Sequence, residues 1–327
     1  MPDSFPSAVD NAWSHPAAIL VATDLADLDR LMPFALDQAM ETGAHLFLLH
    51  VLAAGTGMAM DAVGLPYYDP TAALDLATRT LDPWCALAHR KGIGCDAIIR
   101  EGHPAHQVAE VLRQFKADRV LLGTRSRSKL GKLLLGSVAE QVLRSVNLPV
   151  ITVGPEAHLP VVAQPRVVLH ATTLRETSIP SAALACRIAA IQRARLVLLH
   201  VLPPTEEPGV FHPFAGKTGQ SGQPASLDAA ALHELNLFME KTAADCFSDI
   251  VPQVVHGNPC IEILAAAAEC HASLIVLAAT ERSIFQNLTR DRTIYRVLAH
   301  ARCPVLTLRE PISASIPLKE QLSSIHQ

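Results

Sequence analysis

The sequence predicts an α/β protein made of two tandem, doubly wound domains, each with a five-stranded parallel sheet. Continuous apolar runs such as residues 18–22 and 45–51 are typical of strands that are covered on both faces, as in a parallel sheet. Segments with helical spacing of apolar residues alternate with these runs, so the order in the first half is βαβαβαβαβ. The same succession then returns in the second half.

Individual residues support each element of the first half. The first helix starts near Leu28 and should end at Gly43, because glycine readily adopts the left-handed conformation of a C-cap. The second helix contains Pro83, which should kink or split it. The third has Pro104 at its first position, where a missing N–H costs nothing. A fourth helix follows Gly136, and the five strands are expected at 18–22, 45–51, 95–100, 119–122 and 150–153.

Internal similarity indicates a tandem duplication. The run HLFLLHV at 45–51 returns as RLVLLHV at 195–201, and the run at 119–122 returns at 274–277. We therefore predict a first domain over residues 16–154 and a second over 166–309. The proline-rich segment 155–165 is interpreted as a linker, and residues 1–15 and 310–327 as tails.

Composition narrows the functional classes. The formal net charge of −4 disfavours a general nucleic-acid binder, and no apolar run approaches the ~18 residues of a membrane span. The seven cysteines are scattered without a Cys-x-x-Cys pair, which favours reduced thiols over a disulfide framework. The N-terminus lacks a basic region followed by an apolar core, so no secretory signal is expected. Together these features predict a cytoplasmic protein.

One stretch, residues 117–153, contains the residues that indicate a binding site. A strand ends at Gly123, a basic loop follows, and a helix begins at Gly136-Ser137. Unpaired backbone N–H groups at a helix start, together with the helix dipole, favour a bound anion such as phosphate. From this stretch alone, a phosphate-binding loop and a merely solvated charged loop both remain open.

Taken together, the motifs resemble a tandem universal stress protein. They are Asp24 after the first strand, His50-Val51 at the end of the second, Gly102-x-Pro104, and Gly123-x-x-Ser126 followed after nine residues by Gly136-Ser137. The ATP-binding branch of that family carries Gly-x-x-Gly, nine residues, then Gly-Ser or Gly-Thr. The resemblance covers nearly all of both halves and implies a Rossmann-like fold of the adenine nucleotide α-hydrolase type.

The resemblance also implies a ligand, ATP or AMP, with Mg bridging the phosphates, and a role for each matching residue. Asp24 would contact the adenine or ribose, Ala22 and Val51 would frame the base, and Leu122 would line the cleft. No catalytic residue and no protein-held metal site is expected. The phosphates would be surrounded by Gly123, Arg125, Ser126, Gly136, Ser137 and Val138.

Ser126 departs from the family pattern, which has glycine at this position. If the backbone there needs a positive φ, the side chain would cost roughly 1–2 kcal/mol. If only a close approach is needed, the hydroxyl could add a hydrogen-bond donor. The sequence leaves both readings open.

The second half has lost the motif. Thr173 replaces Asp24, Ala278 replaces Gly123, Glu281 replaces Ser126, and Asp291-Arg292 replaces Gly136-Ser137. Two carboxylates near the expected phosphate position would repel it, so we predict that this half does not bind ATP. Because the fold tolerates these replacements, we also infer that Gly123 and Gly136-Ser137 are more than a folding requirement and need another reason.

These observations predict a cytoplasmic universal stress protein whose first domain uses ATP or AMP as a regulatory switch. The last strands, at 150–153 and 305–308, are apolar and should pair, which would make an internal pseudo-dimer of the two domains. A homodimer of the whole chain and an unidentified protein partner are further expectations. The alternatives are a scaffold without nucleotide that holds an apolar ligand or a protein, and a slow ATP hydrolase.

Overall fold

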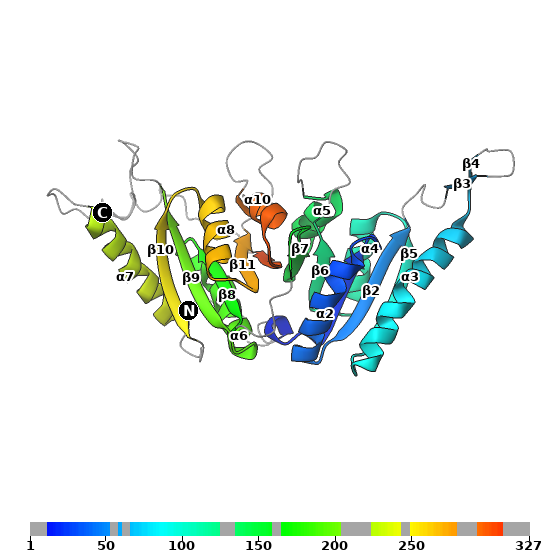
Figure 1. Ribbon diagram of the computed structural model, residues 1–327, viewed down its shortest axis with the longest axis horizontal. Coiled ribbons are helices and arrows are strands. Elements are labelled where there is room, and N and C mark those ends of the chain that lie inside the picture. Colours follow the sequence, from blue (N-terminus) through cyan, green and yellow to red (C-terminus); the bar gives the residue numbers. More distant parts are fainter. Residues whose placement is uncertain are drawn as a thin grey trace, which may run out of the picture.

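A computed structural model describes residues 12–52, 58–60, 66–124, 135–158, 165–203, 224–242, 249–279 and 293–309. The predicted C-terminal tail 310–327, most of the N-terminal tail and most of the predicted linker lie outside these residues. The described strands form one ten-stranded sheet in the order β10-β9-β8-β11-β12-β7-β6-β1-β2-β5, and a small separate pair, β3-β4 (Figure 1).

Each half contributes five parallel strands, which confirms the predicted fold class. In the first half the order β5-β2-β1-β6-β7 places β1 at the centre, where Val21 pairs with Leu48 on one side and Leu121 on the other. All three side chains are buried, as expected for strands covered on both faces. The strands are β1 (Ala18–Thr23), β2 (His45–Leu52), β3 (Met58–Met60), β4 (Pro66–Tyr68), β5 (Cys95–Glu101), β6 (Arg119–Gly123), β7 (Val150–Val153), β8 (Val167–Thr172), β9 (Arg195–Leu202), β10 (Ile250–His256), β11 (Leu274–Ala279) and β12 (Val305–Arg309).

Helices cover both faces of the sheet. One core cluster joins α2 and α3 with α6, and a second joins α4 and α5 with α8 and α10 on the opposite face. This arrangement buries the apolar stripe of each helix against the continuous apolar strands. The helices are α2 (Leu28–Thr42), α3 (Pro70–Arg90), α4 (Pro104–Gln114), α5 (Ser137–Ser145), α6 (Ile179–Ile191), α7 (Pro224–Thr242), α8 (Pro259–Glu269) and α10 (Thr293–His300), with a 3₁₀ turn at Glu176–Ser178.

Two helix predictions have different outcomes. Helix α2 ends at Gly43, whose φ is +73° and whose N–H donates to the Ala39 carbonyl at 2.8 Å, so the predicted glycine cap is confirmed. Helix α3 runs without interruption through Pro83, so a split at this residue is excluded. Leu81 and Cys85 on either side of the proline are both buried, and this packing compensates for the missing backbone hydrogen bond.

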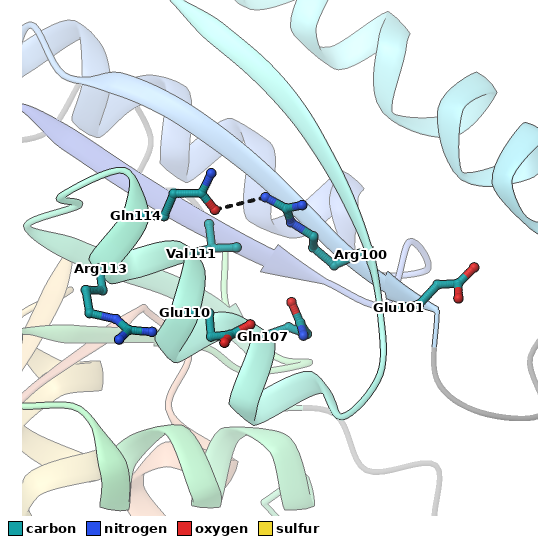
Figure 2. A pocket seen from close by; sticks show the side chains of 7 residues that line it. All are labelled: Arg100, Glu101, Gln107, Glu110, Val111, Arg113 and Gln114. Atoms are coloured by element: carbon teal, nitrogen blue, oxygen red, sulfur yellow. Dashed lines mark hydrogen bonds between the residues drawn. The ribbon is translucent and has the colours of Figure 1, made fainter.

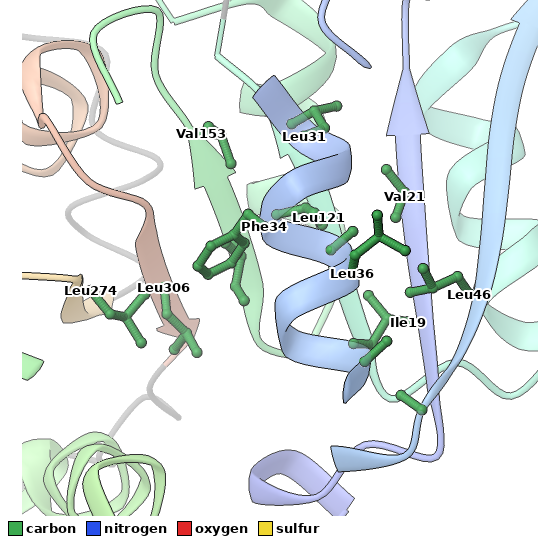
Figure 3. Close-up of a cluster of buried hydrophobic side chains, with 14 of the residues drawn as sticks. Ile19, Val21, Leu31, Phe34, Leu36, Leu46, Leu121, Val153, Leu274 and Leu306 are labelled. Atoms are coloured by element: carbon green, nitrogen blue, oxygen red, sulfur yellow. The ribbon is translucent and has the colours of Figure 1, made fainter. Parts of the chain in front are cut away.

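The two halves meet through their last strands. β7 and β12 pair antiparallel, with Ile151 opposite Leu306, and the Thr152 hydroxyl donates to the Val305 carbonyl at 3.3 Å. The core beside α2 continues across this junction, because Phe34 and Val153 belong to the same buried cluster as Leu306 (Figure 3). The pairing covers what would otherwise be two exposed apolar sheet edges.

Candidate functional site

The predicted site lies where the sheet of the first half changes direction. From β1 the chain proceeds to β2 and β5 on one side and later to β6 and β7 on the other. Ligands of open α/β sheets bind beyond the carboxyl ends of the strands at such a point. Ala22 of β1 pairs with Leu122 of β6, and Val51 lies at the end of β2, next to β1. The structure therefore brings these three predicted residues to one end of the central strands.

Asp24 lies in a tight turn directly after β1. Its Oδ1 accepts the N–H of Ala26 at 3.0 Å, and the preceding Thr23 hydroxyl accepts the N–H of Leu25 at 2.9 Å. Leu25 has a φ of +73°, an uncommon conformation for a leucine. Asp24 is exposed at the end of this strand.

The same turn occurs in the second half, so it is a property of the fold. Leu174 has a φ of +60°, and its N–H donates to the Thr172 hydroxyl at 3.1 Å. Two histidines also match: His50 Nδ1 lies 3.0 Å from the Thr23 carbonyl, and His200 Nδ1 lies 2.9 Å from the Thr172 carbonyl. Both contacts tie the second strand of a half to the end of its first, which is a structural role.

The start of α5 is where the sequence analysis expects an anion. The Gly136 N–H donates to the Thr124 carbonyl at 3.1 Å, which holds the helix start beside the end of β6. Among the described residues no side chain caps this helix, and Ser137 is exposed. Backbone N–H groups of its first turn therefore remain for an anion. Gly136 has a φ of −63°, so its conformation does not require glycine.

Two predicted site residues, Arg125 and Ser126, lie outside the described residues. The same holds for Glu281, Asp291 and Arg292, on which the loss of the motif in the second half partly rests. Val138 follows Ser137 in the first turn of α5 and is half-buried. The conformation required at Ser126 thus stays a question for experiment.

Asp27 is a residue of this site that the sequence analysis missed. It precedes α2, is 5% exposed, and its Oδ1 accepts the Thr23 hydroxyl at 2.5 Å. Burial raises its pKa to about 6. The charge of Asp24 adds to this rise, whereas the Thr23 hydrogen bond and Arg30 oppose it. The only signal in the sequence was an acid just before a helical pattern, which by itself predicts a helix cap.

The position of Asp27 explains from packing why residue 123 is a glycine. A Cβ atom at Gly123 would lie 2.2 Å from Asp27 Oδ2, which is closer than two non-bonded atoms can approach. The sequence analysis infers that Gly123 is more than a folding requirement, and the structure adds a packing reason within the first half, because the glycine makes room for a buried carboxyl group.

A separate cavity of about 550 Å³ lies between β5 and α4 (Figure 2). Its wall mixes both charges and includes a hydrogen bond of 2.9 Å from Arg100 to Gln114. None of the predicted site residues contributes to it. The lining residues are Arg100, Glu101, Gln107, Glu110, Val111, Arg113 and Gln114.

Among the described residues, no group of three or more His, Cys, Asp and Glu side chains could hold a metal ion. Within the same ranges, no helix is both long enough and apolar enough to cross a membrane.

Comparison with known proteins gives matches in both halves. The model of the universal stress protein family matches residues 17–154 and 166–309. A universal stress protein E homolog of Haemophilus influenzae is 28% identical over 155 residues, which is 45% of this chain and 50% of that protein. A universal stress protein of Methanocaldococcus jannaschii is 26% identical over 148 residues, 45% of this chain and 87% of that protein.

A solved structure shares the whole arrangement. The universal stress protein from Archaeoglobus fulgidus DSM 4304 superposes with a TM-score of 0.67 at 19% identity. The superposition covers 92% of this chain and 99% of that one. At this level of identity the likeness establishes the fold.

Proposed function

The chain belongs to the universal stress protein family, and from this premise we propose that residues 16–154 bind an adenine nucleotide, AMP or ATP, as a regulatory switch. One observation carries the proposal: the start of α5, which no side chain of the described residues caps, is held beside the end of β6 at the point where the strand order reverses. Backbone donors at a helix start bind phosphate without any specialised side chain.

Each residue would have a distinct task in this complex. The exposed carboxylate of Asp24 would accept hydrogen bonds from ribose hydroxyls or the adenine amino group. Ala22 and Val51 would frame the base, and the Ser137 hydroxyl would donate to a phosphate oxygen. Arg125 would add positive charge, and Mg would bind through the phosphates rather than through a protein cage.

We assign the second half a structural and regulatory role in a cytoplasmic protein. Thr173 lacks the carboxylate of Asp24, and the pairing of β7 with β12 gives the first half a permanent partner in the same chain. This arrangement would act as a pseudo-dimer that transmits nucleotide binding to a protein partner or a second copy of the chain.

Calorimetry on the full chain tests the proposal. ATP and AMP should bind wild type, whereas Asp24→Ala and Gly136→Asp should each weaken binding at least tenfold, which is about 1.4 kcal/mol. Gly136→Asp puts a negative charge at the helix start, where the phosphate is expected. Thr173→Ala is the matched control in the second half and should leave the affinity unchanged.

Equal affinities for wild type, Asp24→Ala and Gly136→Asp would rule out the proposed site. Mass spectrometry of small molecules released from the denatured protein provides an independent check. We expect AMP or ATP among them, and an apolar ligand in their place would support the scaffold alternative.

A further inference from the structure

Two cysteines of the first half lie in direct contact. Cys85 projects from α3 and Cys95 opens β5, and their Sγ atoms are 3.2 Å apart. Both side chains are buried: Cys95 is 2% exposed, and Cys85, at 9%, retains a small opening to solvent. A disulfide bond length is about 2.05 Å, so an approach of roughly 1.2 Å separates this thiol pair from a bond.

The backbone between the two cysteines holds this contact in place. Helix α3 ends at Lys91, whose N–H donates to the Ala88 carbonyl at 2.9 Å. The next turn contains Gly92, with a φ of +76°, and the Ile93 N–H returns to the same Ala88 carbonyl at 3.0 Å. Because glycine adopts this φ without strain, the chain reverses tightly and brings Cys95 under the last turns of α3.

The two thiols differ chemically. The Cys95 thiol donates its hydrogen bond to Cys85 Sγ, which lowers the pKa of Cys85 and raises that of Cys95. Burial and the nearby carboxylates of Asp82 and Asp96 oppose this lowering of the Cys85 pKa. The Asp96 carboxylate also contacts His45 Nε2 at 2.9 Å. The thiolate is the reactive form of cysteine, so Cys85 is the thiol that attacks first.

We propose that Cys85 and Cys95 form an oxidation site at which a hydroperoxide converts the thiol pair into an intrachain disulfide. The Cys85 thiolate attacks the peroxide O–O bond, is oxidised to a sulfenic acid, and releases water or an alcohol after protonation. Cys95 then attacks the sulfenic sulfur, the S–S bond forms, and the hydroxyl group leaves as water with the Cys95 proton. The product ties α3 to β5, the edge strand of the sheet.

In the described part of the second half, the corresponding edge strand, β10, begins with Ile250, where β5 begins with Cys95. The other described cysteines with a buried thiol are Cys186, Cys260 and Cys303. Burial raises the pKa of Cys260 and Cys303, which disfavours their thiolates. They serve as internal controls in the same molecule.

The test is oxidation of the folded full chain with hydrogen peroxide, followed by alkylation of remaining thiols, trypsin digestion and mass spectrometry. Trypsin cleaves after Arg90 and Lys91, between the two cysteines, so only a disulfide can hold peptides 80–90 and 92–100 together. We expect this linked pair as the main oxidation product, two hydrogens lighter than the two peptides and separated by dithiothreitol. Cys260 and Cys303 should remain alkylated at the same peroxide dose.

Two single variants test the order of the steps. In Cys95→Ser the sulfenic acid of Cys85 has no resolving thiol and should be captured by dimedone, whereas in Cys85→Ser residue Cys95 should stay unmodified. Wild type in which peptides 80–90 and 92–100 stay unlinked, or are linked no faster than after unfolding in urea, would overturn the proposal. Dimedone labelling of Cys95 but not Cys85 would overturn the assigned order.

Discussion

The two halves solve the same packing problem in different ways at the end of their central strands. In the first half the buried residue before helix α2 is Asp27, and the facing end of β6 is Gly123. In the second half the buried residue before α6 is Ser178, and the position of Gly123 is taken by Ala278. The first half thus combines a carboxylate with glycine at these two positions, and the second half has serine and alanine in the corresponding places.

This difference teaches that a motif glycine can serve packing and ligand at once. Gly123 cannot carry a side chain while Asp27 occupies the space beside it. The loss of the glycine in the second half therefore does not by itself report the loss of a ligand site. Gly136 has an ordinary φ of −63°, so backbone conformation does not explain the glycine at this position either.

The largest expected effect comes from His170, a position at which the central strands of the two halves carry different residues. It is fully buried in β8 where β1 has Val21, its Nδ1 lies 3.0 Å from the Val276 carbonyl, and its Nε2 has no partner among the described residues. Burial lowers its pKa to about 4, below the ordinary 6.5. The unfolded chain therefore binds this proton more tightly, and stability is lost as pH falls from 6.5 to 4.

The free energy of unfolding should be about 3 kcal/mol lower at pH 4 than at pH 7 because of His170. His170→Val installs the residue of the first half and should remove this part of the pH dependence. Urea unfolding of both proteins at a series of pH values measures the effect. Parallel pH profiles for wild type and variant would contradict the assignment.

An intermediate effect is expected at Gly123. Gly123→Ala places a Cβ atom against Asp27 Oδ2 and should destabilise the first half by about 1–3 kcal/mol through overpacking. The double variant Asp27→Ser, Gly123→Ala reproduces the pair of the second half and should recover most of this loss. Denaturant midpoints of the wild type, both single variants and the double variant form a mutant cycle. Strict additivity would show that the two positions do not interact.

The smallest effect is expected at Asp27 itself, with a pH sign opposite to that of His170. Its folded pKa of about 6 lies above the ordinary value of 3.8, so the folded state binds the proton more tightly. Stability is therefore lost as pH rises from 3.8 through 6. Asp27→Asn should remove this loss and stabilise the protein by about 1–2 kcal/mol at pH 8, less at pH 4.

Part of the stability that Asp27→Asn gains is offset, because the Thr23 hydroxyl then donates to a neutral amide rather than to a carboxylate. Asp29→Asn, an exposed acid of the same helix, is the matched control and should change stability little. A variant Asp27→Asn that is less stable than wild type at pH 8 would show that the ionised carboxylate is favourable in the fold.

Much of the fold could be predicted because its signals are local. The continuous apolar runs at 18–22 and 45–51, the glycine cap at Gly43 and the first-turn position of Pro104 each act over a few residues, and the structure places β1, β2, α2 and α4 accordingly. The duplication was visible for the same reason, since two copies of one local pattern can be compared directly. Of the two outcomes predicted for Pro83, the split does not occur, because tertiary packing outweighs the local rule.

The α/β class and the two repeats could be predicted from the sequence alone, whereas the binding role of the residues at the ends of β1, β2 and β6 stays a prediction. Only the tertiary structure decided what those residues meet: Asp27 against Gly123, and Cys85 against Cys95. The physical reason is that periodicity records which face of an element is buried. Which side chain fills the space opposite depends on elements joined by hydrogen bonds and packing across the whole sheet.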